Sequence, residues 1–195
     1  MVWASKFNER AFLATKKIGV SLHQIYMAVL CQEIIPAEYA YVIHTTNPTN
    51  AEDNEVYVES CLGLGEALVS TMPGQAFSFT YDKTTKKAHV NAFPNKPLGL
   101  KTTGWIFRSD SNSEDLPGFA GAGLFDSYPM TETSEFRILY HKEKLLIDAP
   151  FRNNFMTKIA QIGVQIEDLY QKAPQDIEGA YYNNQFYVVQ TRPQV

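Results

Sequence analysis

The segment "PQDIEGAYYNNQFYVVQTRP", residues 174 to 193, constrains the fold more than any other part of the chain. Apolar and polar residues alternate on both sides of the pair Asn183-Asn184, which is the pattern of a β-hairpin with a tight turn. The two ends of this hairpin carry polar groups for which a packed sheet has little use. The segment therefore predicts a hairpin whose open end has a role other than packing.

Four polar side chains stand near that open end. Side chains alternate between the two faces of a strand, so Asp176 shares a face with Glu178, and Gln190 shares one with Arg192. A two-residue turn through the asparagines would put Gln190 on the face opposite Glu178, whereas an odd-length loop would bring all four to one face. We predict the odd-length loop, and with it a single polar face.

Such a polar face has a definite chemical use. Mg²⁺ accepts carboxylate and amide oxygens, such as those of Glu178 and Gln190, as ligands. Its other coordination positions are usually taken by water and by substrate phosphates. An arginine such as Arg192 offers planar, permanently charged donors to phosphate oxygens. The alternative is a solvated hairpin end, with Asp176 and Arg192 forming a surface ion pair worth about 0 to 1 kcal/mol. On residue chemistry alone, both interpretations stay open.

The remaining sequence combines strand and helix patterns. Residues 2 to 17 form an amphipathic helical pattern, and residues 151 to 171 place apolar residues three and four apart, as in a helix with one buried stripe. Pro150 suits the first turn of the second helix, and Pro174 enforces its end. Mixed strands with few helices favour the α+β class. We expect a buried strand within residues 25 to 35, a second within 38 to 48, a third that leads through a glycine pair into a short helix within 54 to 70, a hairpin within 76 to 93, and a strand at about 104 to 109.

The composition is that of a globular protein in a reducing compartment. Hydrophobic residues make up 45% and charged residues 19% of the 195 residues, and the formal net charge is -4. This charge gives no general attraction to nucleic acid or to an anionic membrane, so we expect neither partner. Cys31 and Cys61 lie in apolar runs, which suits buried thiols better than a disulfide. With no signal peptide or transmembrane pattern, we expect a soluble intracellular protein.

The segment "FRSDSNSEDLPGFAGAGLFDSYPM", residues 107 to 130, is rich in glycine and serine. A loop of this length in a compact domain is usually functional or mobile. Arg108 and the backbone N–H groups of small residues could fold over phosphates. The plainer interpretation is a glycine-rich surface connection. The small residues in question are Ser109, Ser111, Gly118, Gly121 and Gly123.

The order of several motifs resembles one known family. "VWASKFNERAF", "VLCQEII", "HTTNP", "GLGEALVS", "PQDIEG" and "YVVQTRP" follow one another as in the ATP-binding domain that pyruvate phosphate dikinase, phosphoenolpyruvate synthase and the α-glucan water dikinases share. The resemblance covers most of residues 2 to 193. The glycine-rich segment, which lies after "GLGE", resembles the α-glucan water dikinases in particular. We therefore favour a glucan dikinase over a pyruvate-directed enzyme.

The resemblance implies an ATP-grasp architecture with a mixed, mainly antiparallel sheet and flanking helices. It implies that Glu178 and Gln190 bind Mg²⁺, and that Arg192 holds the phosphates of ATP as the catalytic residue. Asp176 would support these groups. Gln32 matches the segment beside the adenine; the alternative is an ordinary polar residue at the end of a strand.

The resemblance also implies an activity for a longer protein. A glucan dikinase splits ATP into AMP and phosphate, and it passes the β-phosphate through a phosphohistidine to a starch-like glucan. None of the four histidines stands in the context expected of that phosphohistidine, and we interpret His44 as a packed histidine at a strand end. Met1 leads into the first helical pattern without a cap, so we expect residues 1 to 195 to be one partial domain that lacks its N-terminal lobe. A plastid and the cytosol both stay open, as does a non-catalytic ATP-grasp module.

Overall fold

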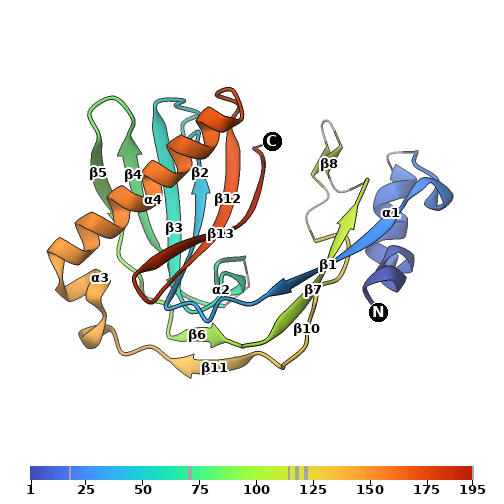
Figure 1. Ribbon diagram of the computed structural model, residues 1–195, viewed down its shortest axis with the longest axis horizontal. Helices are drawn as coiled ribbons and strands as arrows, with labels where there is room; N and C mark the ends of the chain where they lie inside the picture. Colours follow the sequence, from blue (N-terminus) through green and yellow to red (C-terminus); the bar gives the residue numbers. More distant parts are fainter. Residues whose placement is uncertain (18, 70–71, 114, 117–118, 121–122, 195) are drawn as a thin grey trace. The chain divides into compact units, whose positions relative to one another are not determined.

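A computed structural model of the chain describes residues 1–17, 19–69, 72–113, 115–116, 119–120 and 123–194. The chain divides into two compact units. Unit 1 comprises Met1–Ile34 and Thr102–Thr133, and unit 2 comprises Ile35–Lys101 and Ser134–Gln194. Both units mix strands with few helices (Figure 1), which confirms the predicted α+β class.

Unit 2 is built on a six-stranded antiparallel sheet in the order β13-β12-β2-β3-β4-β5. A smaller sheet pairs β6 with β11. The strands at residues 38 to 48, 54 to 62 and 76 to 93 are confirmed, whereas β6, β11 and the short α3 had no counterpart in the sequence patterns. The elements of unit 2 are β2 (Tyr39–His44), β3 (Glu55–Leu62), α2 (Glu66–Val69), β4 (Phe77–Asp82), β5 (Lys87–Ala92), β6 (Leu98–Lys101), β11 (Ser134–Arg137), η3 (Tyr140–Lys142), α3 (Lys144–Ile147), α4 (Ala149–Leu169), β12 (Gln175–Tyr182) and β13 (Gln185–Pro193).

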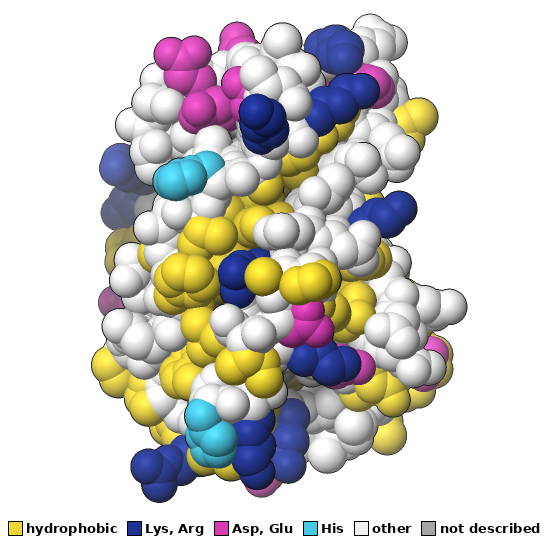
Figure 2. Space-filling view, turned by 90° about the vertical axis from the view of Figure 1, so that its left-hand side faces the viewer, with side chains coloured by type: hydrophobic (Ala, Val, Ile, Leu, Met, Phe, Trp, Pro, Cys, Tyr) yellow, Lys and Arg dark blue, Asp and Glu magenta, His cyan; other side chains and the backbone are white. Residues whose placement is uncertain are grey.

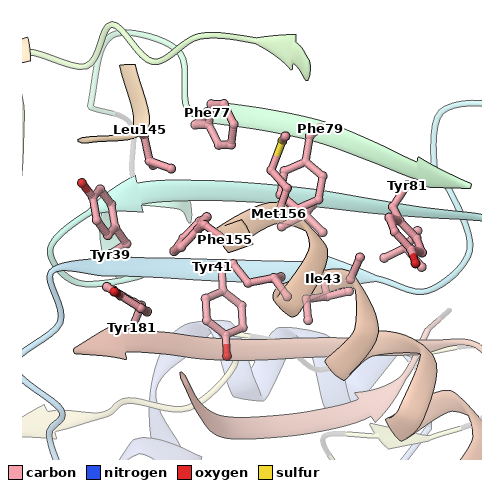
Figure 3. Close-up of a cluster of buried hydrophobic side chains, with 14 of the residues drawn as sticks. Tyr39, Tyr41, Ile43, Phe77, Phe79, Tyr81, Leu145, Phe155, Met156 and Tyr181 are labelled. Atoms are coloured by element: carbon pink, nitrogen blue, oxygen red, sulfur yellow. The ribbon is translucent and has the colours of Figure 1, made fainter. Parts of the chain in front are cut away.

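Helix α4 lies across one face of this sheet (Figure 1). The helix begins where the Asp148 side chain accepts a hydrogen bond from the Phe151 backbone N–H at 2.9 Å, and Pro150 occupies its first turn. These features confirm the helix predicted at 151 to 171. Phe155 and Met156 of α4 lie over the aromatic side chains of the sheet (Figure 3), where each buried apolar side chain contributes about 1.5 to 3 kcal/mol.

The surface of unit 2 is chemically mixed. Figure 2 shows hydrophobic atoms over the middle of one side of the molecule, with acidic, basic and histidine side chains around them. Phe93 is one of the exposed apolar residues, and its ring centroid lies 5.5 Å from the guanidinium carbon of Arg152. In the described part of the chain, no helix is both long enough and apolar enough to cross a membrane.

The hairpin of β12 and β13 corrects one prediction and confirms another. Its turn has two residues, Asn183 and Asn184, with φ angles of 49° and 61°, so the prediction of an odd-length loop is wrong. Two consecutive left-handed residues give the turn whose twist matches that of the strands. The ladder then shifts between Glu178 and Gly179, where a β-bulge leaves Val189 as the extra residue of β13.

The bulge restores the arrangement that the odd-length loop was expected to give. Beyond it Glu178 pairs with Gln190, and Asp176 pairs with Arg192. Paired residues of an antiparallel ladder share a face, so the four side chains lie on one face of the sheet. The single polar face is therefore confirmed, although the extra residue lies in the strand and not in the turn.

Tyr41 of β2 explains why the bulge forms beside a glycine. A Cβ atom on Gly179 would lie 2.2 Å from the Tyr41 ring, so only glycine leaves room for that ring. The ring is buried, and its hydroxyl donates a hydrogen bond to the Tyr187 carbonyl of β13 at 3.0 Å. Tyr41 thus reaches across β12 and holds β13 next to the bulge.

The substitution Gly179→Ala should lower the free energy of unfolding by about 1 to 3 kcal/mol, because overpacking a filled site displaces buried groups. Gly65→Ala is the matched control, since its nearest contact would be Ala40 Cβ at an ordinary 3.6 Å. The control should change stability by less than about 1 kcal/mol. Urea denaturation of both variants measures the difference, and equal destabilisation would contradict the role of Tyr41.

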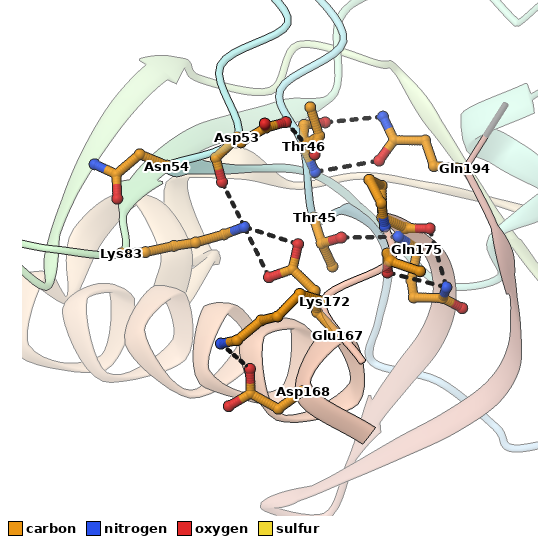
Figure 4. A network of polar contacts seen from close by, with 12 residues as sticks. Thr45, Thr46, Asp53, Asn54, Lys83, Glu167, Asp168, Lys172, Gln175 and Gln194 are labelled. Atoms are coloured by element: carbon orange, nitrogen blue, oxygen red, sulfur yellow. Dashed lines mark hydrogen bonds and ion pairs between the residues drawn. The ribbon is translucent and has the colours of Figure 1, made fainter. Parts of the chain in front are cut away.

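An ion pair between the half-buried Lys83 and the buried Glu167 fastens the end of α4 to the sheet (Figure 4). The ammonium of Lys83 donates to both carboxylate oxygens of Glu167, at 2.9 and 2.8 Å, and to the Asp53 carbonyl at 2.6 Å. The Glu167 side chain is only 6% exposed. The pair therefore joins α4 to the turn between β4 and β5 and to the segment before β3.

Breaking this pair on one side should cost far more than removing both charges. Lys83→Met would leave the Glu167 carboxylate buried without its cation, and we expect a loss of about 3 to 5 kcal/mol. The double variant Lys83→Met/Glu167→Met should recover most of that loss. Denaturant unfolding of the two single variants and the double variant measures the coupling, and strict additivity would argue against it.

Unit 1 contains a three-stranded antiparallel sheet in the order β1-β7-β10, with a short β8-β9 pair. The helix predicted at 2 to 17 is divided at Asn8, whose side-chain oxygen accepts from the Ala11 N–H at 2.7 Å and so starts a new helix. The elements of unit 1 are η1 (Val2–Phe7), α1 (Glu9–Lys17), η2 (Leu22–Gln24), β1 (Met27–Glu33), β7 (Trp105–Ser111), β8 (Asp115–Leu116), β9 (Phe119–Ala120) and β10 (Tyr128–Pro129).

Strand β1 is less buried than its apolar sequence predicts. Its residues are half-buried or exposed, and Leu30 is 51% exposed. The thiol of Cys31 is exposed, so the prediction of a buried thiol is wrong at this position, while Cys61 is buried. Burial raises the pKa of the Cys61 thiol to about 12. A run of apolar residues therefore does not by itself place a strand in a core.

Candidate functional site

The polar face of the six-stranded sheet borders a cavity of about 170 Å³. Ile177 of β12 packs in the core on the α4 side, so its neighbours Asp176 and Glu178 point to the other side of the sheet. The cavity lies wholly within unit 2, on strands β13, β12, β2 and β3 and on α2. Its lining residues are Val42, His44, Glu59, Leu68, Val69, Asp176, Glu178, Gln190 and Arg192.

One row of cavity residues joins two basic side chains through a single carboxylate. Arg192, Asp176 and His44 are lateral neighbours on β13, β12 and β2. The Nδ1 atom of His44 lies 2.7 Å from Oδ1 of Asp176, and the Nε atom of Arg192 lies 3.7 Å from Oδ2. The side chains of Asp176 and His44 are 18% and 24% exposed, so their contact is partly shielded from water.

A second row, two residues along the strands, is rich in oxygen ligands. Gln190, Glu178, Val42 and Glu59 are lateral neighbours on β13, β12, β2 and β3. Strand geometry separates this row from the first by about 7 Å. Tyr57 donates a hydrogen bond to Glu59 Oε1 at 3.2 Å. Burial, and next the nearby Glu59 carboxylate, raise the pKa of Tyr57 above its usual value.

A network of amide hydrogen bonds fixes the strand ends beside the first row (Figure 4). The buried Gln175 donates its backbone N–H to Thr45 Oγ1 at 2.8 Å, and its side-chain oxygen accepts from Thr191 at 3.2 Å. Gln194 pairs with the backbone N–H and carbonyl of Thr46, at 3.2 and 2.8 Å. Because Thr45 and Gln175 directly adjoin His44 and Asp176 in sequence, this network holds the first row in place.

The charges of the cavity favour a divalent cation together with an anion. Glu59, Asp176 and Glu178 outnumber the one permanently charged cation, Arg192, so a polyanion alone would meet repulsion. Hard oxygen donors suit Mg²⁺, which leaves some of its positions to water and phosphate. Within the described residues, no group of three or more His, Cys, Asp or Glu side chains could hold a metal ion by itself. The donor set therefore fits Mg²⁺ carried in with a phosphate ligand.

Comparison with known proteins gives the family. The sequence matches the family described as "Pyruvate phosphate dikinase, AMP/ATP-binding domain" over residues 1–195. The chain belongs to this family. It is 50% identical over its whole length to the chloroplastic α-glucan water dikinase of Solanum tuberosum and 48% identical to α-glucan water dikinase 1 of Arabidopsis thaliana. It is 27% identical, over 98% of its length, to the phosphoenolpyruvate synthase of Pyrococcus furiosus.

The chain spans only a small part of these relatives. It covers 13% of the potato protein, 14% of the Arabidopsis protein and 21% of the Pyrococcus protein. Its similarity to the two glucan dikinases is nevertheless much higher than to the synthase. The match identifies an ATP-binding domain of the dikinase family, in agreement with the resemblance carried by the sequence motifs.

Within this family domain, the structure brings together four of the residues predicted from the sequence. Asp176, Glu178, Gln190 and Arg192 all line the cavity. Sequence reasoning missed Glu59, which reaches the same cavity from β3. Glu59 alternates with the buried residues 58 and 60, which places its side chain on the other face of β3. With the strand order also known, in which β2 lies between β3 and β12, this alternation would have predicted Glu59 at the cavity.

The sequence interpretation of His44 was incomplete. It was expected to be a packed histidine at a strand end, and it does stand at the last residue of β2. The structure shows in addition that it lines the cavity and contacts Asp176. The two residues are 132 positions apart in the chain, so no local pattern could reveal the contact.

The other two predicted site residues belong to unit 1. Gln32 and Arg108 lie on neighbouring strands β1 and β7, where Arg108 Nη1 donates to Gln32 Oε1 at 3.4 Å. Both are half-buried. The structure thus places this pair together on a unit other than the one that contains the cavity. Two members of the proposed glycine-rich phosphate loop, Gly118 and Gly121, lie outside the described residues.

Proposed function

We propose that this chain is the nucleotide-binding portion of an α-glucan water dikinase, and that the cavity of unit 2 receives the phosphates of Mg-ATP. The observation that carries the proposal is the juxtaposition of Glu178, Gln190 and Arg192 on one sheet face around a cavity. These residues combine ligands for a hard cation with a donor for phosphate oxygens. The ATP-grasp-like architecture of this portion is part of the same proposal.

Under this proposal, different cavity residues would bind the metal ion and the phosphates. Glu178 and Gln190 would bind Mg²⁺, and Glu59 adds a carboxylate on the same row. The bound ion would neutralise charge on the phosphates. Arg192 would hold the transferring phosphates, with the Asp176 carboxylate orienting its guanidinium. Phosphoryl transfer requires mainly such positioning and charge stabilisation from the protein.

The glucan substrate is proposed from the relatives. The high identity to the glucan dikinases, compared with 27% to the synthase, favours glucan over pyruvate as the final acceptor. The complete enzyme would release AMP from ATP, transfer one phosphate to water, and pass the β-phosphate through a phosphohistidine to a starch-like glucan. Other parts of the dikinase would provide the phosphohistidine and the contacts with glucan.

The proposal also assigns roles in unit 1. From the family resemblance we propose that Gln32 lies beside the adenine, and from its position in the glycine-rich segment that Arg108 contacts a phosphate. A hydrogen bond of 3.4 Å from Arg108 Nη1 to Gln32 Oε1 joins the two side chains. These roles stay predictions, and they are separate from those of the cavity residues.

Replacing Glu178 tests the metal assignment. Glu178→Ala should weaken binding of Mg-ATP by about tenfold or more, because an oxygen ligand and its charge are lost; tenfold corresponds to about 1.4 kcal/mol. Glu135→Ala, at an exposed position of β11, is the control and should leave the affinity unchanged. Isothermal titration with and without Mg²⁺ measures both effects. Equal affinities of the Glu178→Ala variant and the unchanged chain would refute the metal role.

The 195-residue chain should bind the nucleotide without turning it over. None of its four histidines resembles the family's phosphorylated histidine, so the chain lacks the expected phosphoryl acceptor. Incubation with Mg-ATP, followed by chromatographic assay for AMP, measures this. Release of AMP by the chain alone would contradict the assignment of that acceptor to another part of the dikinase.

A further inference from the structure

His44 is a cavity residue to which the proposed function gives no role. The carboxylate of Asp176 lies between two basic side chains, with one oxygen at Arg192 and the other at His44. All three residues line the cavity. If Asp176 orients Arg192 toward phosphates, the same carboxylate orients His44 in the same lateral row. The arrangement is that of two basic side chains that share one carboxylate.

The ring of His44 has one nitrogen committed and one available for a ligand. Its Nδ1 atom contacts Asp176 Oδ1 at 2.7 Å, which leaves Nε2 as the nitrogen able to meet a ligand in the cavity. A protonated imidazole donates from both nitrogens. In that form the ring can donate to Asp176 and to a phosphate oxygen at once.

The surroundings of His44 fit this role. From β3 the Tyr57 ring lies beside it, with ring centroids 6.2 Å apart. Glu59 of β3 and Glu178 of β12 are the other acidic groups on this face, and both stand one row away. Arg192 is the permanent cation of the row. A phosphate oxygen above the row would thus meet donors from two sides of Asp176.

We propose that His44 is a phosphate-binding residue of this site: its Nε2 atom donates a hydrogen bond to a phosphate oxygen of the nucleotide, while Asp176 fixes the ring. The inference rests on the proposed function, since it concerns the same cavity. It adds a contact from β2 to those expected from β12 and β13. The phosphates would then be held by three neighbouring strands.

Isosteric substitutions separate the two ring nitrogens. His44→Asn keeps an amide near the Nδ1 position and loses the group at Nε2, whereas His44→Gln places an amide near Nε2 and gives up the contact with Asp176. His44→Phe keeps a ring and loses both donors. The probes are Mg-ATP and inorganic triphosphate with Mg²⁺, which has phosphates but no base. Thermal unfolding of each variant checks that it folds.

We expect His44→Asn and His44→Phe to bind both probes about tenfold more weakly, as for loss of one hydrogen bond to a charged group. His44→Gln should stay within about threefold of the unchanged chain. In the unchanged chain, the ¹⁵N resonance of Nε2 should shift when Mg-triphosphate is added, which a purely structural histidine would not show.

The outcomes distinguish this inference from the proposed function. If the unchanged chain binds both probes and His44→Asn binds them equally well, the role of His44 is refuted while the nucleotide site stands. An unchanged Nε2 resonance on binding would have the same meaning. If the unchanged chain binds neither probe, the nucleotide site in this chain is refuted, and the role of His44 with it.

Discussion

The contact of Tyr41 with Gly179 is the constraint on which the polar cavity depends. The tight turn of the hairpin fixes a register in which Gln190 would lie opposite Ile177, on the face that packs against α4. A polar residue buried there without partners would be costly. The bulge beside Gly179 moves the register by one residue, and the Tyr41 hydroxyl holds β13 at that point. The absence of a Cβ atom at residue 179 thus allows the register in which these polar side chains face the cavity.

The local sequence pattern was sufficient for most strands and for α4, but not for this register. Alternation gave the faces within each strand, and the two asparagines marked the turn correctly. The length of the turn was wrong because alternation alone does not distinguish an extra residue in a loop from one in a bulge. The available signal was Gly179, since a glycine inside a strand often marks a bulge or a close approach.

The composition of the site shows a different limit of sequence reasoning. The residues on the hairpin could be predicted because they are close in sequence and share one periodicity. His44 and Glu59 could not, since their place in the cavity depends on β2 lying between β12 and β3. That order is set by packing of the whole sheet under α4. Residues on one structural element are therefore predictable from spacing, while residues joined across elements require the topology.

The two rows of the cavity separate charge in a way that suits a metal-bound polyanion. Arg192 and His44 flank Asp176 in one row, whereas the other row offers the oxygens of Gln190 and Glu178. The amide network at the ends of β12 and β13 ties down the backbone beside the first row without any ligand. A preorganised site spends little binding free energy on rearrangement. Three carboxylates line the cavity with one permanent cation, so under the proposed function such a site would attract phosphates only together with a divalent cation. Asp176, which contacts both basic side chains, is one of the three carboxylates from which that dependence would arise.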